Sequence, residues 1–318
     1  MRRTSLYAFF GILFIAAVLV GCDKRSRNGR TDTPTSGAIT FASDESFAPI
    51  IEELVEQFEY KYPNAKLTPQ YVNEIDGFNL IKEMKTCLYF TSRPLKESEV
   101  AYMKTLRQSP SVFPIGYDGL AFICNLNNND TCITVNDVKR VLSGEITDWK
   151  QLNPNSKLGK MNVIFDNASS ATLHYVVDSI LGGKPIDSPN ITHLNSSKEV
   201  IEYVDKTANA IGVIGSNWLN DRLDSVNITF KKNIHVMSVS SLDTATPTNS
   251  RKPYAGYLLT GEYPFARTLY AIVVDPQKAL PWSFANYIAK PEGQMIVLRA
   301  GLLPYRGDIT IRRVKVKN

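Results

Sequence analysis

Short apolar segments alternate with amphipathic helical segments through the first half of the chain, and this alternation restricts the possible folds more than any other feature. Apolar residues recur at helical spacing in the first long segment, at Ile50, Ile51, Leu54, Val55 and Phe58. Strand–helix alternation of this kind favours a parallel sheet covered by helices. We predict strands at residues 38–42, 66–72 and 87–91 and helices at 47–60, 77–84 and 96–106.

The second half continues with strands and helices and contains no internal repeat. A long apolar stretch spans residues 114–125. About 280 of the 318 residues follow the N-terminal region, which is enough for one large domain or two modest lobes. We therefore predict an α/β fold, with further strands at 162–165, 210–214 and 269–274 and further helices at 135–142, 171–181, 197–206 and 282–299.

The N-terminus has the pattern of an export signal. Arg2 and Arg3 precede an apolar run at residues 6–20, which is shorter than the roughly 20 residues of a membrane-spanning helix but suits a signal peptide. The run closes with Leu-Val-Gly before Cys22, which resembles the bacterial lipobox. We predict a signal peptide at residues 1–21 and a lipidated Cys22. The mature protein would be anchored in the cell envelope, facing the periplasm or the cell exterior.

Residues 22–37 are rich in polar residues, glycine and proline and lack large apolar side chains, so we expect a flexible tether. The formal charge is +5, and loss of Arg2 and Arg3 with the signal leaves about +3. This charge is too small to indicate a nucleic-acid partner. The basic tail at 312–317 is expected to be a solvated end.

The cysteines suggest no metal site. No CxxC motif and no His–Cys spacing is present, so we expect neither a metal nor a cofactor. Cys124 and Cys132 flank a turn-rich linker and either form a disulfide or remain free. Cys87 precedes an apolar segment and is expected to be a buried thiol.

Three turns share one design, in which a strand is followed by a serine and then by a helix. Ser46 precedes Phe47, Ser92 precedes Arg93, and the segment Ser169-Ser170-Ala171-Thr172 follows the strand ending at Phe165. A helix N-terminus leaves backbone N–H groups unpaired and carries partial positive charge, so it can bind anions. We expect Ser46 to cap the helix that begins at Phe47.

The turns could converge on one crevice, because the carboxyl ends of parallel strands face the same side of an open sheet. Arg93 would then supply formal charge to a bound oxyanion. The alternative for each turn is that its serine only caps a helix.

Several motifs together resemble one family, the phosphate-binding PstS type of periplasmic-binding-protein-like proteins. The resemblance covers about residues 39–305, and its most specific stretch is at 138–149, from Val138 to Trp149. The other matching segments are 46–50, 91–96, 117–121, 210–214, 263–267 and 291–293.

The resemblance implies a two-lobed type II binding-protein fold with a ligand cleft between the lobes. It implies one lobe at residues 38–120 and 260–318, a second lobe at 121–259, and hinge crossings near 118–124 and 269–274. It also implies a monomer that delivers its ligand to an ABC permease. The family contact positions carried over are Ser46 with Phe47, Ser92 with Arg93, and Ser170 with Thr172, and Ser169 lies in the same third loop.

The chain departs from the family pattern by adding carboxylates. The third loop usually reads Gly-Ser-Gly-Thr with an arginine shortly before it, whereas here Asp166 lies near the place of the arginine. A serine loop of the family corresponds here to 74–77, which brings Asp76, and Asp44 and Glu45 adjoin the first loop. One carboxylate can accept a proton from phosphate, but several would repel a dianion.

These observations predict a solute-binding lipoprotein that captures phosphate or a related oxyanion. Two alternatives remain, namely the same fold binding a different small polar solute and a sensing or scaffold lipoprotein without a transport role. We expect no enzymatic activity, because His174 lies near Ser169 and Ser170 without a Gly-x-Ser-x-Gly elbow.

Overall fold

The computed structural model describes residues 30–186, 188–220 and 230–307. Within these ranges one mixed sheet has the strand order β2-β1-β3-β11-β4-β8-β6-β7, with β9 and β12 also paired to β4. A separate parallel pair joins β5 to β10. The strands are β1 (Gly37–Asp44), β2 (Ala65–Val72), β3 (Leu88–Thr91), β4 (Ser111–Asn125), β5 (Cys132–Thr134), β6 (Asn162–Phe165), β7 (Ile191–His193), β8 (Ala210–Gly215), β9 (Ile234–Val236), β10 (Ser238–Ser240), β11 (Ala266–Val273) and β12 (Leu303–Pro304).

Helices cover both faces of this sheet. Short 3-10 turns follow β1, β8 and the loop after α5 (Val135–Leu142). The α-helices are α2 (Ala48–Lys61), α3 (Glu74–Lys82), α4 (Glu97–Thr105), α5 (Val135–Leu142), α6 (Ala171–Tyr175), α7 (Ser197–Lys206), α8 (Ala255–Leu259), α9 (Leu280–Ile288) and α10 (Pro291–Arg299). The 3-10 turns lie at Glu45–Phe47, Trp149–Gln151 and Ser216–Trp218, and a π-helical turn at Val176–Ile180 continues α6.

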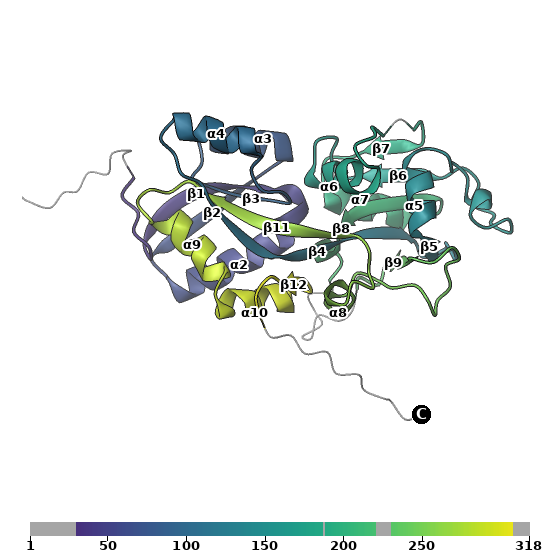
Figure 1. Cartoon of the computed structure of the whole chain (residues 1–318). Helices are drawn as coiled ribbons and strands as arrows, with labels where there is room; N and C mark the ends of the chain where they lie inside the picture. The colour runs from purple at the N-terminus through teal and green to yellow at the C-terminus, as the bar shows by residue number, and fades with distance from the viewer. Residues whose placement is uncertain (1–29, 187, 221–229, 308–318) are drawn as a thin grey trace, which may run out of the picture.

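Two long strands connect the halves of the molecule. β4 pairs antiparallel with β11 as far as Gly119 and then with β8 from Leu120 onward. β1 is parallel to β2 and β3 on one side, and β6 is parallel to β7 and β8 on the other. Figure 1 shows β4 and β11 running from one lobe into the other. These strands correspond to the two predicted hinge crossings.

Each lobe has its own hydrophobic core. In the first lobe α2 and α9 pack on one face of β1, where the rings of Phe41, Phe58 and Phe90 surround Phe284 at centroid distances of 5.2–5.9 Å. Apolar residues of α3 and α4 pack on the opposite face. In the second lobe the fully buried Trp149 belongs to a separate core. The two cores do not divide at residue 260, because Tyr263, Phe265 and Leu303 belong to the core of Trp149. The predicted lobe boundaries stay a prediction.

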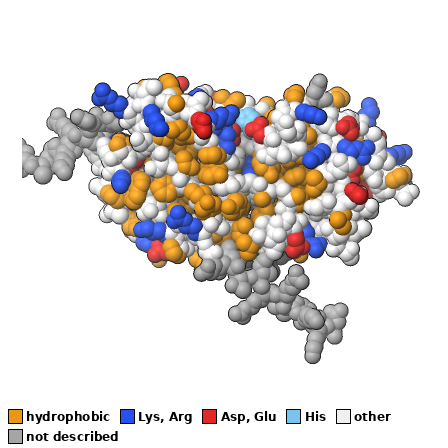
Figure 2. All heavy atoms as spheres, viewed as in Figure 1, with side chains coloured by type: hydrophobic (Ala, Val, Ile, Leu, Met, Phe, Trp, Pro, Cys, Tyr) orange, Lys and Arg blue, Asp and Glu red, His pale blue; other side chains and the backbone are white. Residues whose placement is uncertain are grey.

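The surface shown in Figure 2 carries hydrophobic side chains over β11 and β4, where this face of the hinge strands is not covered by a helix. No helix within the described ranges is long and apolar enough to span a bilayer. The predicted signal peptide, Cys22 and the basic tail at 312–317 lie outside the described residues.

Three predicted elements differ from the structure. The single helix expected at 282–299 is wrong, because α9 ends at Ile288 and α10 begins at Pro291. Proline lacks the N–H of a helix interior and keeps the preceding Lys290 extended (φ −89°, ψ 165°). The helix expected at 171–181 changes to π geometry after Tyr175, and α3 begins earlier than expected, at Glu74.

The described cysteines are free thiols. Cys124 is buried in the second lobe and forms no disulfide with Cys132. Of the two alternatives, a disulfide or two free thiols, the structure therefore has the free thiols. Cys87 is only partly buried, and the Arg30 guanidinium donates to its Sγ at 3.2 Å.

Candidate functional site between the lobes

The first predicted loop is organised by an aspartate rather than by its serine. The Asp44 carboxylate accepts the Ser46 N–H at 2.9 Å and caps the 3-10 turn that follows β1. The expectation that Ser46 caps this helix start is therefore wrong. Its Oγ is buried beside Asp44 and makes no contact of hydrogen-bonding geometry. Phe47 is fully buried and lies 4.5 Å beneath the guanidinium of Arg267.

The third predicted loop binds a carboxylate of its own. Ser170 caps α6 by accepting the Leu173 N–H and donates its hydroxyl proton to Asp166 at 2.6 Å. Thr172 Oγ1 donates to the other Asp166 oxygen at 2.9 Å. Asp166 is fully buried, so both hydroxyl groups that the sequence suggested for a ligand are engaged by an internal anion. Ser169 is half-buried and faces the first lobe through its backbone carbonyl.

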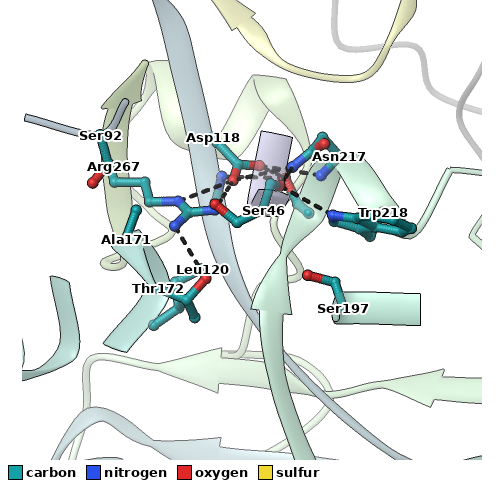
Figure 3. Close-up of polar contacts among 12 residues, drawn as sticks. Ser46, Ser92, Asp118, Leu120, Ala171, Thr172, Ser197, Asn217, Trp218 and Arg267 are labelled. Atoms are coloured by element: carbon teal, nitrogen blue, oxygen red, sulfur yellow. Dashed lines mark hydrogen bonds and ion pairs between the residues drawn. The ribbon is translucent and has the colours of Figure 1, made fainter. Parts of the chain in front are cut away.

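A buried ion pair lies between these two loops, on the hinge strands. The Arg267 guanidinium donates to Asp118 Oδ2 at 2.9 and 3.1 Å and to Thr172 Oγ1 at 3.2 Å. Neither side chain of the pair is exposed to solvent. Ser216 donates to the other Asp118 oxygen, and Figure 3 shows Arg267 directed at Asp118 with Thr172 beside it. Arg267 is thus the buried arginine of the interface, whereas Arg93 was expected to supply formal charge to a bound oxyanion.

Arg93 and the second predicted loop lie at the rim of the interface instead. The Arg93 guanidinium pairs with Glu99 at 2.9 Å and Glu74 at 3.3 Å and stacks 3.5 Å above the ring of Phe78. The Ser92 hydroxyl donates to Glu74 at 3.3 Å. Glu74, Phe78, Arg93 and Glu99 line part of a groove of about 300 Å³ at the surface.

Asp76 also lies away from the buried cluster. Its side chain is exposed and accepts a hydrogen bond from the Asn73 amide, which caps α3. The structure therefore brings Ser46, Phe47, Ser170, Thr172 and Asp166 together but leaves Asp76 at the surface.

Carboxylates of the first lobe hold donors of the second lobe, and the lobes are closed on each other. Asp44 Oδ2 accepts the Ala171 N–H at 3.1 Å. Glu45 accepts the N–H of Ser197 at 3.2 Å and its hydroxyl at 3.0 Å. The Ala171 methyl group is fully buried in the core of the first lobe.

Neutral and charged side chains complete this closed interface. The side chains of Asn217 and Trp218 donate to the Ser46 carbonyl at 2.9 and 3.1 Å, as Figure 3 shows. Glu74 and His174 pair across the mouth of the interface at 2.9 Å. Both lobes thus contribute polar groups to one continuous hydrogen-bonded layer.

Burial and mutual repulsion change the proton affinity of these carboxylates. Burial raises the pKa of Glu45 to about 8, and the nearby charge of Asp166 adds to the rise. Burial also raises the pKa of Asp44 to about 6, with Asp166 again adding to the effect. Burial favours the neutral form of Glu74, but the hydrogen bond and charge of His174, the charge of Arg93 and the hydrogen bond from Ser92 together lower its pKa. The hydrogen bond to Glu74 raises the pKa of His174.

Two α/β lobes, hinge strands between them and polar side chains of both lobes meeting at the interface define a two-lobed solute-binding protein. The chain belongs to the PBP superfamily, whose domain model matches residues 28–292. It is 22% identical to the phosphate-binding protein PstS of Staphylococcus epidermidis over 88% of this chain and 83% of that protein. It is 24% identical to the phosphate-binding protein PstS of Borreliella burgdorferi over 83% of this chain and 89% of that protein.

A solved structure supports the fold. A putative phosphate ABC transporter substrate-binding protein of Clostridium perfringens, crystallised with bound phosphate, superposes with a TM-score of 0.68. It is 20% identical and covers 85% of this chain and 100% of that chain. The predicted resemblance to PstS-type proteins and the predicted two-lobed type II fold are confirmed by these matches.

Sequence reasoning missed several contributors to the interface, among them Glu45, Ser197, Arg267, Asn217 and Trp218. Glu45 was noted only as a neighbour of the first loop, and Ser197 only as a helix start. Arg267 lay inside a matching motif, at the end of Tyr-Pro-Phe-Ala-Arg, but nothing in its spacing indicated that Asp118 is its partner. A helix beginning with two serines was the available signal for Ser197, which is fully buried despite its polar side chain.

Proposed function

We propose that this protein is the extracytoplasmic solute-binding component of an ABC transporter and captures phosphate or a related oxyanion between its lobes. One observation carries the proposal. The hydroxyls of Ser170, Thr172 and Ser197 and the Ala171 N–H meet beside the buried cation Arg267 at the interface of a PstS-like fold. Clustered hydroxyl and N–H donors near a guanidinium are the groups that replace the hydration shell of an oxyanion.

Capture requires the lobes to separate and then close again around the solute. In the closed arrangement these donors hold the carboxylates of Asp44, Glu45 and Asp166. An entering oxyanion would accept hydrogen bonds from the same donors. Closure of the lobes about the hinge strands β4 and β11 would shield it from water. Hinge closure around a ligand is a standard movement of two-lobed binding proteins.

A second candidate ligand class is favoured by the carboxylates themselves. Asp44 and Asp166 are buried and Glu45 is partly buried, and all three are acceptors. A small solute with hydroxyl or ammonium donors would match these acceptors better than a phosphate dianion, because buried charges require partners of opposite sign.

The proposal extends to the location and mode of action of the protein. Cys22 would carry the lipid anchor, and the protein would act as a monomer beside its permease. The expectation of a flexible tether as far as residue 37 is wrong for residues 30–37, because Arg30 pairs with Asp275, Asp32 accepts the Leu280 N–H and Gly37 begins β1. A binding role is favoured over nucleophilic catalysis, because the Ser170 hydroxyl donates to Asp166 and His174 pairs with Glu74.

Isothermal titration of the mature protein with phosphate tests the function. We expect exothermic or endothermic heats that saturate, and a rise in Tm with phosphate concentration. Ser170→Ala and Thr172→Val should each weaken binding, whereas Glu83→Gln, an exposed change of charge on the first lobe, should not. The absence of both heat and a Tm shift at millimolar phosphate and arsenate would exclude these ligands. A parallel Tm screen with polyols and amines tests the second candidate class.

A further inference from the structure

The donors of the inter-lobe site are already occupied by the protein's own carboxyl groups. The Ala171 N–H is bound by Asp44 at 3.1 Å, and the N–H and hydroxyl of Ser197 are bound by Glu45 at 3.2 and 3.0 Å. Both carboxylates belong to the first lobe, and both donors belong to the second. A carboxylate presents two oxygens much as one edge of phosphate does, so each contact imitates a contact with a bound oxyanion.

A second feature shows that this arrangement leaves part of the site unsatisfied. Ser46 Oγ and Asn217 Oδ1 are buried at the same interface, and neither makes a hydrogen bond in the closed structure. Buried polar side-chain atoms nearly always have a partner. The unsatisfied Ser46 hydroxyl lies next to Asp44 in sequence and space, and it would become a further donor for a solute that displaced this carboxylate.

The charges around these carboxylates make a second anion unfavourable while they remain in place. Asp166 faces Asp44 and Glu45 from the second lobe and raises the pKa of each. Arg267 offsets part of this charge, but its guanidinium is bound to Asp118. At the mouth of the interface, His174 is paired with Glu74, so its positive charge is balanced by that carboxylate.

We propose that Asp44 and Glu45 are internal competitors for the oxyanion site, so that their carboxylates set its affinity by occupying the donors a bound oxyanion needs. This inference rests on the proposed function and names the residues that regulate the same site. An oxyanion binds by displacing the carboxylates from the donors of Ala171 and Ser197. Solutes that merely fill space between the lobes gain none of these hydrogen bonds.

The amide variants Asp44→Asn and Glu45→Gln test the proposal, because an amide keeps the size of the side chain but removes the charge that competes. Titration with inorganic phosphate at about pH 8.5 should give a Kd at least about tenfold lower in each variant than in the wild type. Glu83→Gln removes one exposed carboxylate of the same lobe and should leave the Kd unchanged. Circular dichroism and Tm establish that each variant is folded, and the two single variants provide independent tests.

The possible results separate the proposal from the function on which it rests. Amide variants that bind phosphate as weakly as the wild type, or more weakly, overturn the competitor role and leave the phosphate function standing. Variants that bind phosphate when the wild type does not support the competitor role and exclude phosphate as the wild-type ligand. If neither the wild type nor the variants bind phosphate or arsenate, both the function and the competitor role are refuted.

Discussion

Closure of the lobes should depend on pH through Glu45. Burial and the charge of Asp166 raise the pKa of this carboxyl from 4.5 to about 8 in the closed structure. In an open form the side chain is solvated and titrates near its ordinary value. Between pH 4.5 and about pH 8, Glu45 is protonated in the closed form and deprotonated in the open form, so closure takes up a proton. Raising the pH therefore weakens closure by about 1.4 kcal/mol per pH unit.

The total effect follows from the width of this interval. From 4.5 to about 8 it amounts to about 5 kcal/mol in favour of the open form. The effect is absent below the lower value, grows through neutral pH and is complete above the upper value. Asp44, whose pKa burial raises to about 6, acts in the same direction over a narrower interval. The closed form is thus expected to dominate in mild acid and to lose stability in base.

Small-angle X-ray scattering of the solute-free mature protein measures this opening. We expect the radius of gyration to increase between about pH 6 and about pH 9, because the lobes separate as protons are released. Glu45→Gln should flatten the increase, since an amide does not titrate, whereas Glu83→Gln should not. A radius that stays constant in the wild type, or that rises equally in Glu45→Gln, would refute the reasoning.

His174 contributes to the same pH dependence and has to be separated from Glu45. The hydrogen bond to Glu74 raises the pKa of His174, so its inter-lobe ion pair is present at lower pH and is lost as the pH rises through that value. His174→Gln should remove the part of the increase that persists in Glu45→Gln. If His174→Gln alone abolishes the whole increase, the effect assigned to Glu45 is wrong.

Three further predictions concern the hinge, the anchor and the core. Asp118→Leu should lower the free energy of unfolding by about 3–5 kcal/mol because it leaves Arg267 buried without a partner, and adding Arg267→Met should restore at least half of the loss; urea denaturation that shows no restoration would contradict this. Cys22→Ser should move the protein from the detergent phase to the aqueous phase of a phase-partition assay, whereas Cys87→Ser should not; a shift in both, or in neither, would count against a lipidated Cys22. Phe284→Ala should cost about 3–5 kcal/mol in the same denaturation assay, and a loss below about 1 kcal/mol would show that the first core does not depend on this ring.

Local sequence patterns predicted most helices and strands well where caps and apolar stripes agreed. The helices expected at 135–142 and 197–206 are confirmed at both ends, and the side-chain oxygens of Thr134 and Ser196 cap their N-termini. The 282–299 segment misled the prediction because its apolar residues keep helical spacing across the break at Pro291. The spacing of apolar residues shows which side of a segment faces the core. Two consecutive helices that pack on the same core can therefore show one uninterrupted spacing.

The site was predictable only as far as its loops. Strand ends that meet at one edge indicated that all three loops could converge. The first and third meet at the buried cluster, but the second lies at the rim, where Arg93 pairs with Glu74 and Glu99. The contacts that fill the site join residues 127 and 152 positions apart, from Asp44 to Ala171 and from Glu45 to Ser197. Neither local spacing nor residue type specifies such pairs. The sequence analysis named only Arg93 as the source of positive charge, whereas the pairing of β11 with β4 brings Arg267 to Asp118.

The departures from the family pattern fit together as a single change in the site. Ala171 stands where the resemblance implies a glycine, and its methyl group is buried in the first lobe's core. Asp166 lies near the place of the family arginine and accepts from Ser170 and Thr172, while Asp44 accepts from Ala171. The hydroxyl groups of Ser170 and Thr172 and the N–H of Ala171 each have an internal carboxylate as their partner. That is the arrangement expected of a receptor whose solute must compete with the protein's own side chains.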